Sequence, residues 1–210
     1  MTDTKAPGGG TLAVVGSEID ALDVRALHRR AIMFALDTLR SVRSGQMDLP
    51  TPCAGWDLRD LIGHMVAENR GFIAAAGGST EPDAWRDDAL GGDPWVDFAT
   101  TAVDVVAALA GDEVSERSLL IREFGSFPGS VAIAMHFVDN LVHAWDVART
   151  IGAPDTIDPE LALIALDFAE RWKLGKPGGA FGGAVEAPAD ATPGERLVAL
   201  LGRMPDRRAG

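Results

Sequence analysis

The most informative segment of the chain is SVAIAMHFVDNLVHAWDVARTI, residues 130–151. At about 100° per residue, an α-helix places His136, Asp139, His143 and Asp146 within an arc of roughly 80°. Nearly everything outside that arc is apolar, which is typical of a helix in the interior of a protein. The arc could simply be the one face in contact with water, but such faces are usually built from Lys, Glu, Arg and Gln. Imidazoles and short carboxylates are instead side chains that hold divalent metal ions.

The length and charge of the chain limit the classes of protein to consider. Its 210 residues are enough for one domain. A formal net charge of -12 argues against binding to nucleic acid or to an anionic membrane surface. No apolar run reaches the roughly eighteen residues of a membrane-spanning helix, and the first residues do not form a secretory signal. Cys53 is the only cysteine, so no internal disulfide can form, and we expect a cytoplasmic protein.

Apolar residues recur at helical spacing along most of the chain, and strand patterns are nearly absent. Helix starts are marked by Asp57, by Asp93 and Asp158 directly before prolines, and by Thr192 with Glu195 in a capping box. The predicted helices cover residues 24–42, 57–76, 94–109, 130–151 and 159–173, and a short helix follows Pro193. Four long helices with short and medium connections predict an all-α fold, a four-helix bundle with extra short helices near its C-terminal end.

The sequence contains no clean domain boundary. One metal-binding helical-bundle domain is expected over residues 17–205, after a flexible N-terminal tail of residues 1–16. Within the domain, residues 175–205 hold a Gly/Pro-rich loop and the last short helix. Residues 117–124 are predicted to form a short strand or an extended loop, and residues 125–129, GSFPG, a cluster of turns.

A metal site on the helix of residues 130–151 needs a ligand from elsewhere in the chain. Asp139 and His143 stand at i and i+4, so their side chains emerge one above the other. The third candidate is His64, on the second predicted helix. The stripe of His64 continues through small residues, among them Gly71, which we expect to leave volume for an ion and its ligand. The alternative is that His64 is an ordinary core or surface histidine.

Three further side chains are candidates for supporting these ligands. Asp146 lies one turn beyond His143 and could orient its ring through the free nitrogen, pair with a nearby arginine, or face water. Glu68 lies one turn beyond His64 and could play the same part or be a fourth ligand, although a solvated glutamate is the simpler expectation. His136 could be a hydrogen-bond donor behind the ligands, a substrate contact, or merely exposed.

Two other reactive side chains are expected to stay outside the chemistry. His28 lies beside Arg29 and Arg30 at the edge of its helix, so we expect it to be solvated. Cys53 lies in TPCAGW, just before a helix N-terminus, where a thiolate is favoured. Because no histidine is close to it in sequence, we expect a buried or inert thiol rather than a nucleophile.

Three stretches together resemble a known family: TPCAGWDLRDLIGHMVAENRGFIAAA, FGSFPGSVAIAMHFVDNLVHAWDVARTIG and FGGAVEAPADATPGERLVALLGR. They are similar to the DinB-like superfamily, and resemble the N-terminal domain of mycothiol-dependent maleylpyruvate isomerase. The resemblance covers roughly residues 20–205, and implies a four-helix bundle with a metal ion near one end. It also implies three protein ligands, matching His64, Asp139 and His143. Much of the superfamily has His or Glu where this chain has Asp139, which is one methylene shorter than Glu.

The resemblance also implies a chemistry. Characterised relatives use mycothiol, bacillithiol or glutathione to isomerise or conjugate electrophilic small molecules. A divalent ion with an open position lowers the pKa of a bound thiol and yields a thiolate at neutral pH. The first hypothesis is therefore a metal-dependent, mycothiol-dependent transferase or isomerase that takes a low-molecular-weight thiol and an electrophilic small molecule. Zinc is the default ion, although nickel, iron or manganese also suits nitrogen and oxygen ligands.

Two alternatives stay open at this point. The same scaffold could carry a thiol-independent isomerase, cyclase or hydrolase of a small-molecule pathway, such as one that makes a natural product. It could also be a non-catalytic metal-binding module, whose site would be closed by a fourth side chain such as Glu68 or His136. A homodimer formed through one face of the bundle is compatible with either alternative.

Overall fold

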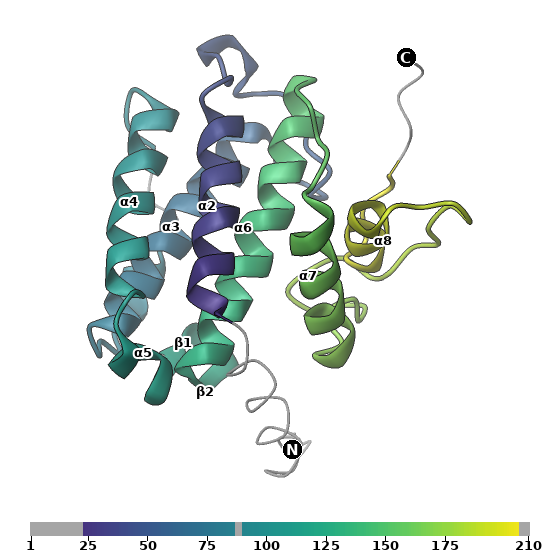
Figure 1. Cartoon of the computed structure of the whole chain (residues 1–210). Coiled ribbons are helices and arrows are strands. Elements are labelled where there is room, and N and C mark those ends of the chain that lie inside the picture. Colours follow the sequence, from purple (N-terminus) through teal and green to yellow (C-terminus); the bar gives the residue numbers. More distant parts are fainter. Residues whose placement is uncertain (1–22, 87–89, 206–210) are drawn as a thin grey trace, which may run out of the picture.

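A computed structural model describes residues 23–86 and 90–205 of the chain (Figure 1). The predicted tail of residues 1–16 lies outside this described part. The all-α prediction is confirmed, because four long helices pack side by side as a bundle (Figure 1). These helices are α2 (Val24–Leu39), α3 (Leu58–Ala76), α4 (Pro94–Ala108) and α6 (Gly129–Ile151).

Contacts between the helices give the topology of the bundle. His28 and His136 meet near the starts of α2 and α6, so these two helices run in the same direction. Phe72, near the end of α3, also stacks on His136, so α3 runs against α6. Arg40, just after α2, lies over the ring of Trp95 at the start of α4, so α4 runs against α2. The order is therefore up, down, down, up, and the chain must return along the bundle between α3 and α4 (Figure 1).

The helix starts predicted from capping residues are confirmed. Asp57 and Asp60 form a capping box at α3, and Thr192 and Glu195 form another at α8 (Pro193–Leu200). An aspartate directly before a proline caps α4, and another caps α7 (Pro159–Arg171). These caps satisfy backbone N–H groups that have no partner within the helix, so local sequence alone determines where these helices begin.

The segment between α4 and α6 matches the prediction in part, because a short strand does form within residues 117–124. After a short helix, α5 (Asp112–Glu116), it forms an antiparallel hairpin of β1 (Ser118–Ile121) and β2 (Gly125–Pro128). The predicted turn cluster over residues 125–129 is therefore wrong, since most of it is β2. The chain instead reverses in a 3-10 turn, η3 (Arg122–Phe124), which ends at Gly125 with a φ of 101°. A side chain would disfavour that backbone conformation. Glycine at this position therefore allows the second strand to begin directly after the turn.

The remaining differences are small. Helix α2 ends at Leu39 rather than near residue 42. The amide groups of Ser41 and Val42 bond to carbonyls three residues back instead of four, so the α-helical pattern stops there. Two further 3-10 turns, η1 (Ser44–Gln46) and η2 (Pro82–Trp85), lie in the connections.

Helix α6 is the centre of the molecule. It contacts α2, α3, α5, α7 and both strands, and α8 packs against α7 on the outer side (Figure 1). Most of its side chains are buried, including His136, His143 and Asp146 from the polar arc. The arc is therefore not a solvent-facing side. In the described part of the chain, no helix is both long and apolar enough to cross a membrane.

Candidate metal centre

The structure brings His64, Asp139 and His143 together where α3 crosses α6. Oδ1 of Asp139 lies 3.6 Å from Nε2 of His64 and 3.3 Å from Nε2 of His143. The three ligand atoms all lie within 4.8 Å of one another. In a tetrahedral zinc site with bonds of about 2.0–2.1 Å, neighbouring ligand atoms are about 3.3 Å apart. The side chains therefore have nearly the spacing that one shared ion requires.

Asp139 has the electrostatics of a ligand. Its Oδ2 atom is buried and has no hydrogen-bond partner among the described residues, although nearly all buried carboxylate oxygens in proteins have one. Burial by itself would raise the pKa of Asp139. The charge of His143 and hydrogen bonds from His143 and His64 outweigh burial and hold that pKa well below its usual value. Asp139 is therefore an ionised carboxylate that still has an oxygen to offer.

The second nitrogen of His143 is held by Asp146. The Nδ1 atom lies 3.0 Å from Oδ2 of Asp146, which is fully buried. When Nδ1 donates to this carboxylate, the ring is held in the orientation that turns Nε2 towards Asp139. Burial acts to lower the pKa of His143, but the charge of Asp139 and hydrogen bonds to Asp139, Asp146 and Cys53 raise it well above its usual value. Asp146 thus occupies the position expected of a group that orients a ligand.

Sequence reasoning missed Arg203, which lies just after α8 and is buried. Its Nε donates to Oδ1 of Asp146 at 3.1 Å, and its Nη2 donates to Oδ2 at 2.8 Å. Burial acts to raise the pKa of Asp146, but the hydrogen bond from His143 and the charge of Arg203 hold it below its usual value. The only signal in the sequence was an arginine in the otherwise apolar stretch LLGRMP, which does not identify a partner.

Cys53 joins the same cluster and is half-buried. Its thiol lies 3.2 Å from Oδ2 of Asp146 and 3.8 Å from Nδ1 of His143. These three residues also have the spacing of a metal site. However, Nη2 of Arg203 donates to the Cys53 sulfur at 3.2 Å, so a guanidinium already supplies the positive charge. We therefore interpret this second group as a salt-bridged cluster and not as a second metal centre.

Glu68 is buried, so the expectation of a solvated glutamate is wrong. Its carboxylate pairs with Arg122, whose guanidinium also lies over the ring of Trp85 at 5.1 Å. The Glu68 oxygen is 3.9 Å from Nδ1 of His64, on the side of the ring away from Asp139. Glu68 thus lies behind His64 and does not approach the shared centre as a fourth ligand.

His136 is fully buried and uses both ring nitrogens. Its Nδ1 lies 2.9 Å from Nε2 of His28, and its Nε2 lies 2.9 Å from Nδ2 of Asn140. The expectation that His28 is solvated is wrong, because α2 packs along α6 and turns this ring into the core. Burial lowers the pKa of His136 to about 4, and burial with the neighbouring ring lowers that of His28 well below its usual value. His136 is therefore neither exposed nor free to bind an ion.

The small residue Gly71 does not leave space for an ion as predicted. A Cβ atom at this position would lie 2.1 Å from Cε3 of Trp85, so the missing side chain makes room for an indole ring. The rings nearest the ligands are those of Trp56, 4.9 Å from the His64 ring, and of Phe181, 5.8 Å from the His143 ring.

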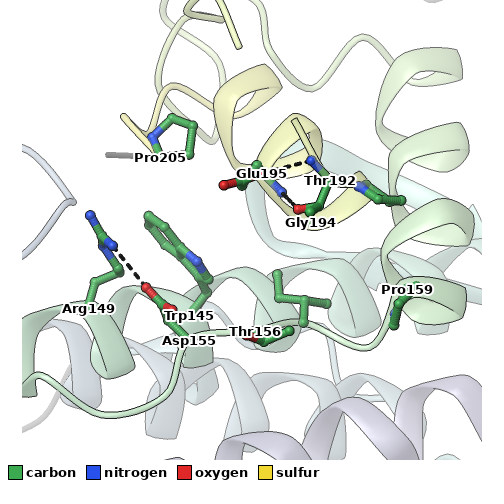
Figure 2. Close-up of a pocket in the computed structure, with 11 residues that line it drawn as sticks. Trp145, Arg149, Asp155, Thr156, Pro159, Thr192, Gly194, Glu195 and Pro205 are labelled. Carbon is green, nitrogen blue, oxygen red and sulfur yellow. Dashed lines mark hydrogen bonds and ion pairs between the residues drawn. The ribbon is translucent and has the colours of Figure 1, made fainter. Parts of the chain in front are cut away.

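A cavity of about 530 Å³ lies elsewhere, between the end of α6 and the start of α8 (Figure 2). Trp145 and Arg149 face Glu195 and Thr192 across it, and Arg149 is paired with Asp155 at 3.0 Å (Figure 2). Trp145 is two residues from His143 and so lies on nearly the opposite side of α6. This cavity is therefore separate from the three candidate ligands.

Comparisons with known proteins agree with this architecture. The family model described as the mycothiol maleylpyruvate isomerase N-terminal domain matches residues 28–148. Two uncharacterized proteins from strains of Mycobacterium tuberculosis, Rv0738 and MT0763, are each 33% identical to the chain over 186 residues. Those alignments cover 87% of this chain and 98% of each relative.

Solved structures share the fold. The crystal structure of the mycothiol-dependent maleylpyruvate isomerase aligns with a TM-score of 0.57 and 20% identity, over 78% of this chain and 76% of that one. A mutant of that enzyme aligns with the same TM-score and 19% identity. The bundle is thus the all-α, DinB-like fold that the sequence predicted. Because the family model spans more than half of its residues, the chain belongs to the mycothiol maleylpyruvate isomerase N-terminal domain family.

Proposed function

We propose that this protein is a metal-dependent enzyme that uses mycothiol to isomerise an electrophilic small molecule or to conjugate it. The observation that carries the proposal is the convergence of His64, Asp139 and His143 on one centre. No fourth His, Cys, Asp or Glu side chain joins that group among the residues that the structure describes. Three protein ligands with one position open to water or substrate are typical of catalytic zinc sites, whereas four protein ligands are typical of structural ones.

The two side chains that could have closed the site are engaged elsewhere. Glu68 pairs with Arg122 behind His64, and His136 is held between His28 and Asn140. This arrangement favours a catalytic site over a non-catalytic module.

Each residue of the site has its own role in the proposed reaction. His64, Asp139 and His143 would hold the ion, with zinc as the first choice for two imidazoles and one carboxylate. When bound, the ion would supply the positive charge that lowers the pKa of a thiol beside it. Asp146 keeps the proton of His143 on Nδ1. Packed apolar side chains surround the buried part of α6, where the lower local dielectric strengthens the charge interactions of His143 and Asp146, while His64 and Asp139 stay partly exposed.

A thiolate formed in this way can carry out either reaction. It adds to an activated double bond, which then becomes a single bond and can rotate. Elimination returns the thiol and leaves the isomerised product, whereas protonation of the adduct leaves a stable conjugate. The family assignment supports mycothiol as the thiol, because the matching family model is described as the mycothiol maleylpyruvate isomerase N-terminal domain.

The test is a titration of cobalt-substituted protein with mycothiol, followed by absorption spectroscopy. We expect a new sulfur-to-cobalt charge-transfer band and a rise in melting temperature. Mycothiol disulfide, which has no free thiol, should produce neither change. The titration is carried out on the Cys53→Ala variant as well as on the natural chain. The Cys53 sulfur lies close to His143, so the variant shows that the band comes from mycothiol. An unchanged spectrum and melting temperature in both proteins would contradict the use of mycothiol.

A further inference from the structure

We propose that Arg203 is a positioning residue for the metal site, acting on His143 through Asp146. This inference rests on the metal binding proposed above. Arg203 lies outside residues 28–148, the part of the chain that the family model matches. The C-terminal segment of the chain would therefore complete a site whose ligands all come from the bundle.

The contacts of Arg203 form a fork around Asp146. Two of its nitrogens bond separate oxygens of that carboxylate, at 3.1 and 2.8 Å. A third nitrogen, Nη1, donates to the carbonyl oxygen of Leu201 at 2.7 Å, which anchors the guanidinium to its own backbone. Both Arg203 and Asp146 are buried, at 5% and 0% exposure. Bidentate pairing of this kind determines orientation as well as charge.

Close backbone packing brings this arginine to the site. Gly202 has a φ of 87°, and a Cβ atom there would lie 2.8 Å from the backbone of Gly182. The two glycines therefore let the end of the chain pass directly over residues 181–183. The ring of Phe181 lies beside the site, with its centroid 5.8 Å from that of His143 and 5.4 Å from the Arg203 guanidinium.

The physical role follows from what Asp146 has to do. It is buried, with Oδ2 3.0 Å from Nδ1 of His143, and a buried carboxylate needs bonded partners to hold one orientation. Arg149, one turn further along α6, is paired with Asp155 and lies beside the separate cavity. Arg203 bonds both oxygens of Asp146 and therefore holds this carboxylate in the orientation that faces His143. Without it, His143 would lose its fixed orientation.

The test is a double-mutant cycle read out as metal affinity. Zinc or cobalt affinity is measured by competition with a chelator for the natural chain, Arg203→Met, Asp146→Asn and the double variant. We expect Arg203→Met to weaken binding by about 10–100-fold, as changes behind a metal ligand typically do. If Arg203 acts through Asp146, the double variant should bind no more weakly than Asp146→Asn alone.

Two further variants separate positioning from general charge and stability. Arg203→Lys keeps the charge but loses the fork, so we expect it to stay at least about fivefold weaker than the natural chain. Arg196→Met changes an exposed arginine on α8 and should leave the affinity unchanged. Nitrogen-15 NMR of the histidine rings in the zinc-loaded protein should show the Nδ1 proton of His143 retained in the natural chain and exchanging faster in Arg203→Met.

The outcomes are distinguishable. If Arg203→Met does not fold, the double variant still decides the question, because it removes both buried charges together. Natural protein that binds no metal overturns the proposed function, and this inference with it. Tight binding by the natural chain together with affinities within twofold for Arg203→Met, or additive losses in the cycle, overturns this inference alone.

Discussion

The Nδ1 atom of His136 lies 2.9 Å from Nε2 of His28, so two buried imidazoles from neighbouring helices share one hydrogen bond. One nitrogen must donate and the other accept, which only neutral rings can do without placing a charge in the core. Asp139 acts to raise the pKa of His136, whereas His64 acts to lower it. Burial dominates, and the pKa of His136 falls from 6.5 to about 4.

This pair predicts a loss of stability in mild acid. The unfolded chain binds a proton at His136 near pH 6.5, whereas the folded chain binds it only near pH 4. Between these pH values protonation therefore favours the unfolded state, and the stability present above pH 6.5 is lost as the pH falls towards 4. For His136 alone, the free energy of unfolding should fall by about 2 kcal/mol between pH 7 and pH 5. Urea unfolding of the metal-free protein at both pH values measures it.

A variant without the two imidazoles isolates their contribution. In His28→Gln/His136→Gln, the drop between pH 7 and pH 5 should be smaller by at least that amount. An equal drop in both proteins would show that other groups cause it.

The metal content of the protein provides a second prediction. Protein purified without added metal should carry about one divalent ion per chain, since zinc sites of this kind retain their ion through purification. His143→Ala and His64→Ala should each carry far less, because the two ligands that remain in each variant hold the ion much less tightly. Elemental analysis measures the content. Ions retained in full by both variants would place the metal somewhere other than this centre.

Added zinc should also stabilise the fold. An ion that binds only the folded state adds about 2.7 kcal/mol to the free energy of unfolding at a free concentration 100 times its dissociation constant. Denaturant unfolding of metal-depleted protein with and without zinc measures this gain. Asp139→Ala should lose it, while Asp104→Ala, a change to an exposed carboxylate on α4, should keep it. A gain that survives in Asp139→Ala would argue against Asp139 as a ligand.

The packing of Trp85 against α3 predicts the effect of a small mutation. Gly71→Ala should destabilise the protein by about 1–2 kcal/mol, because the overlap of its Cβ with the indole outweighs the better helix propensity of alanine. Gly45→Ala is the matched control, since a Cβ there meets nothing within 4 Å. Chemical unfolding of both variants compares them. A Gly71→Ala protein as stable as the control would mean that Trp85 moves away without cost.

Much of the fold could be predicted from local sequence. Asp57 and Thr192 mark helix starts because their side chains cap amide groups a few residues away. The periodicity of α6 predicts that Asp139 and His143 share one side of a buried helix. Two ligands on one helix need a third from elsewhere, and His64 on the second predicted helix is the candidate. The structure brings these three side chains together, and whether they bind an ion stays a prediction.

Other features could not be predicted because they depend on partners distant in sequence. His28 was expected in water beside two arginines, but its neighbour in space is His136. Gly71 was expected to border an ion, but the connection after α3 returns and places Trp85 there. The hairpin strand β2 was expected as turns, since GSFPG contains turn residues and its pairing partner lies in β1.

The helices, their capped starts and the polar side of α6 follow from local sequence, because they depend on residues within one or two turns of each other. Long-range packing instead brings the Arg203 guanidinium to Asp146 and to the Cys53 sulfur. That arrangement requires Gly202 to pass over Gly182, a contact between backbones that no side-chain pattern encodes. The charge on a buried carboxylate is set by whichever cation packs beside it, and packing is a property of the whole chain.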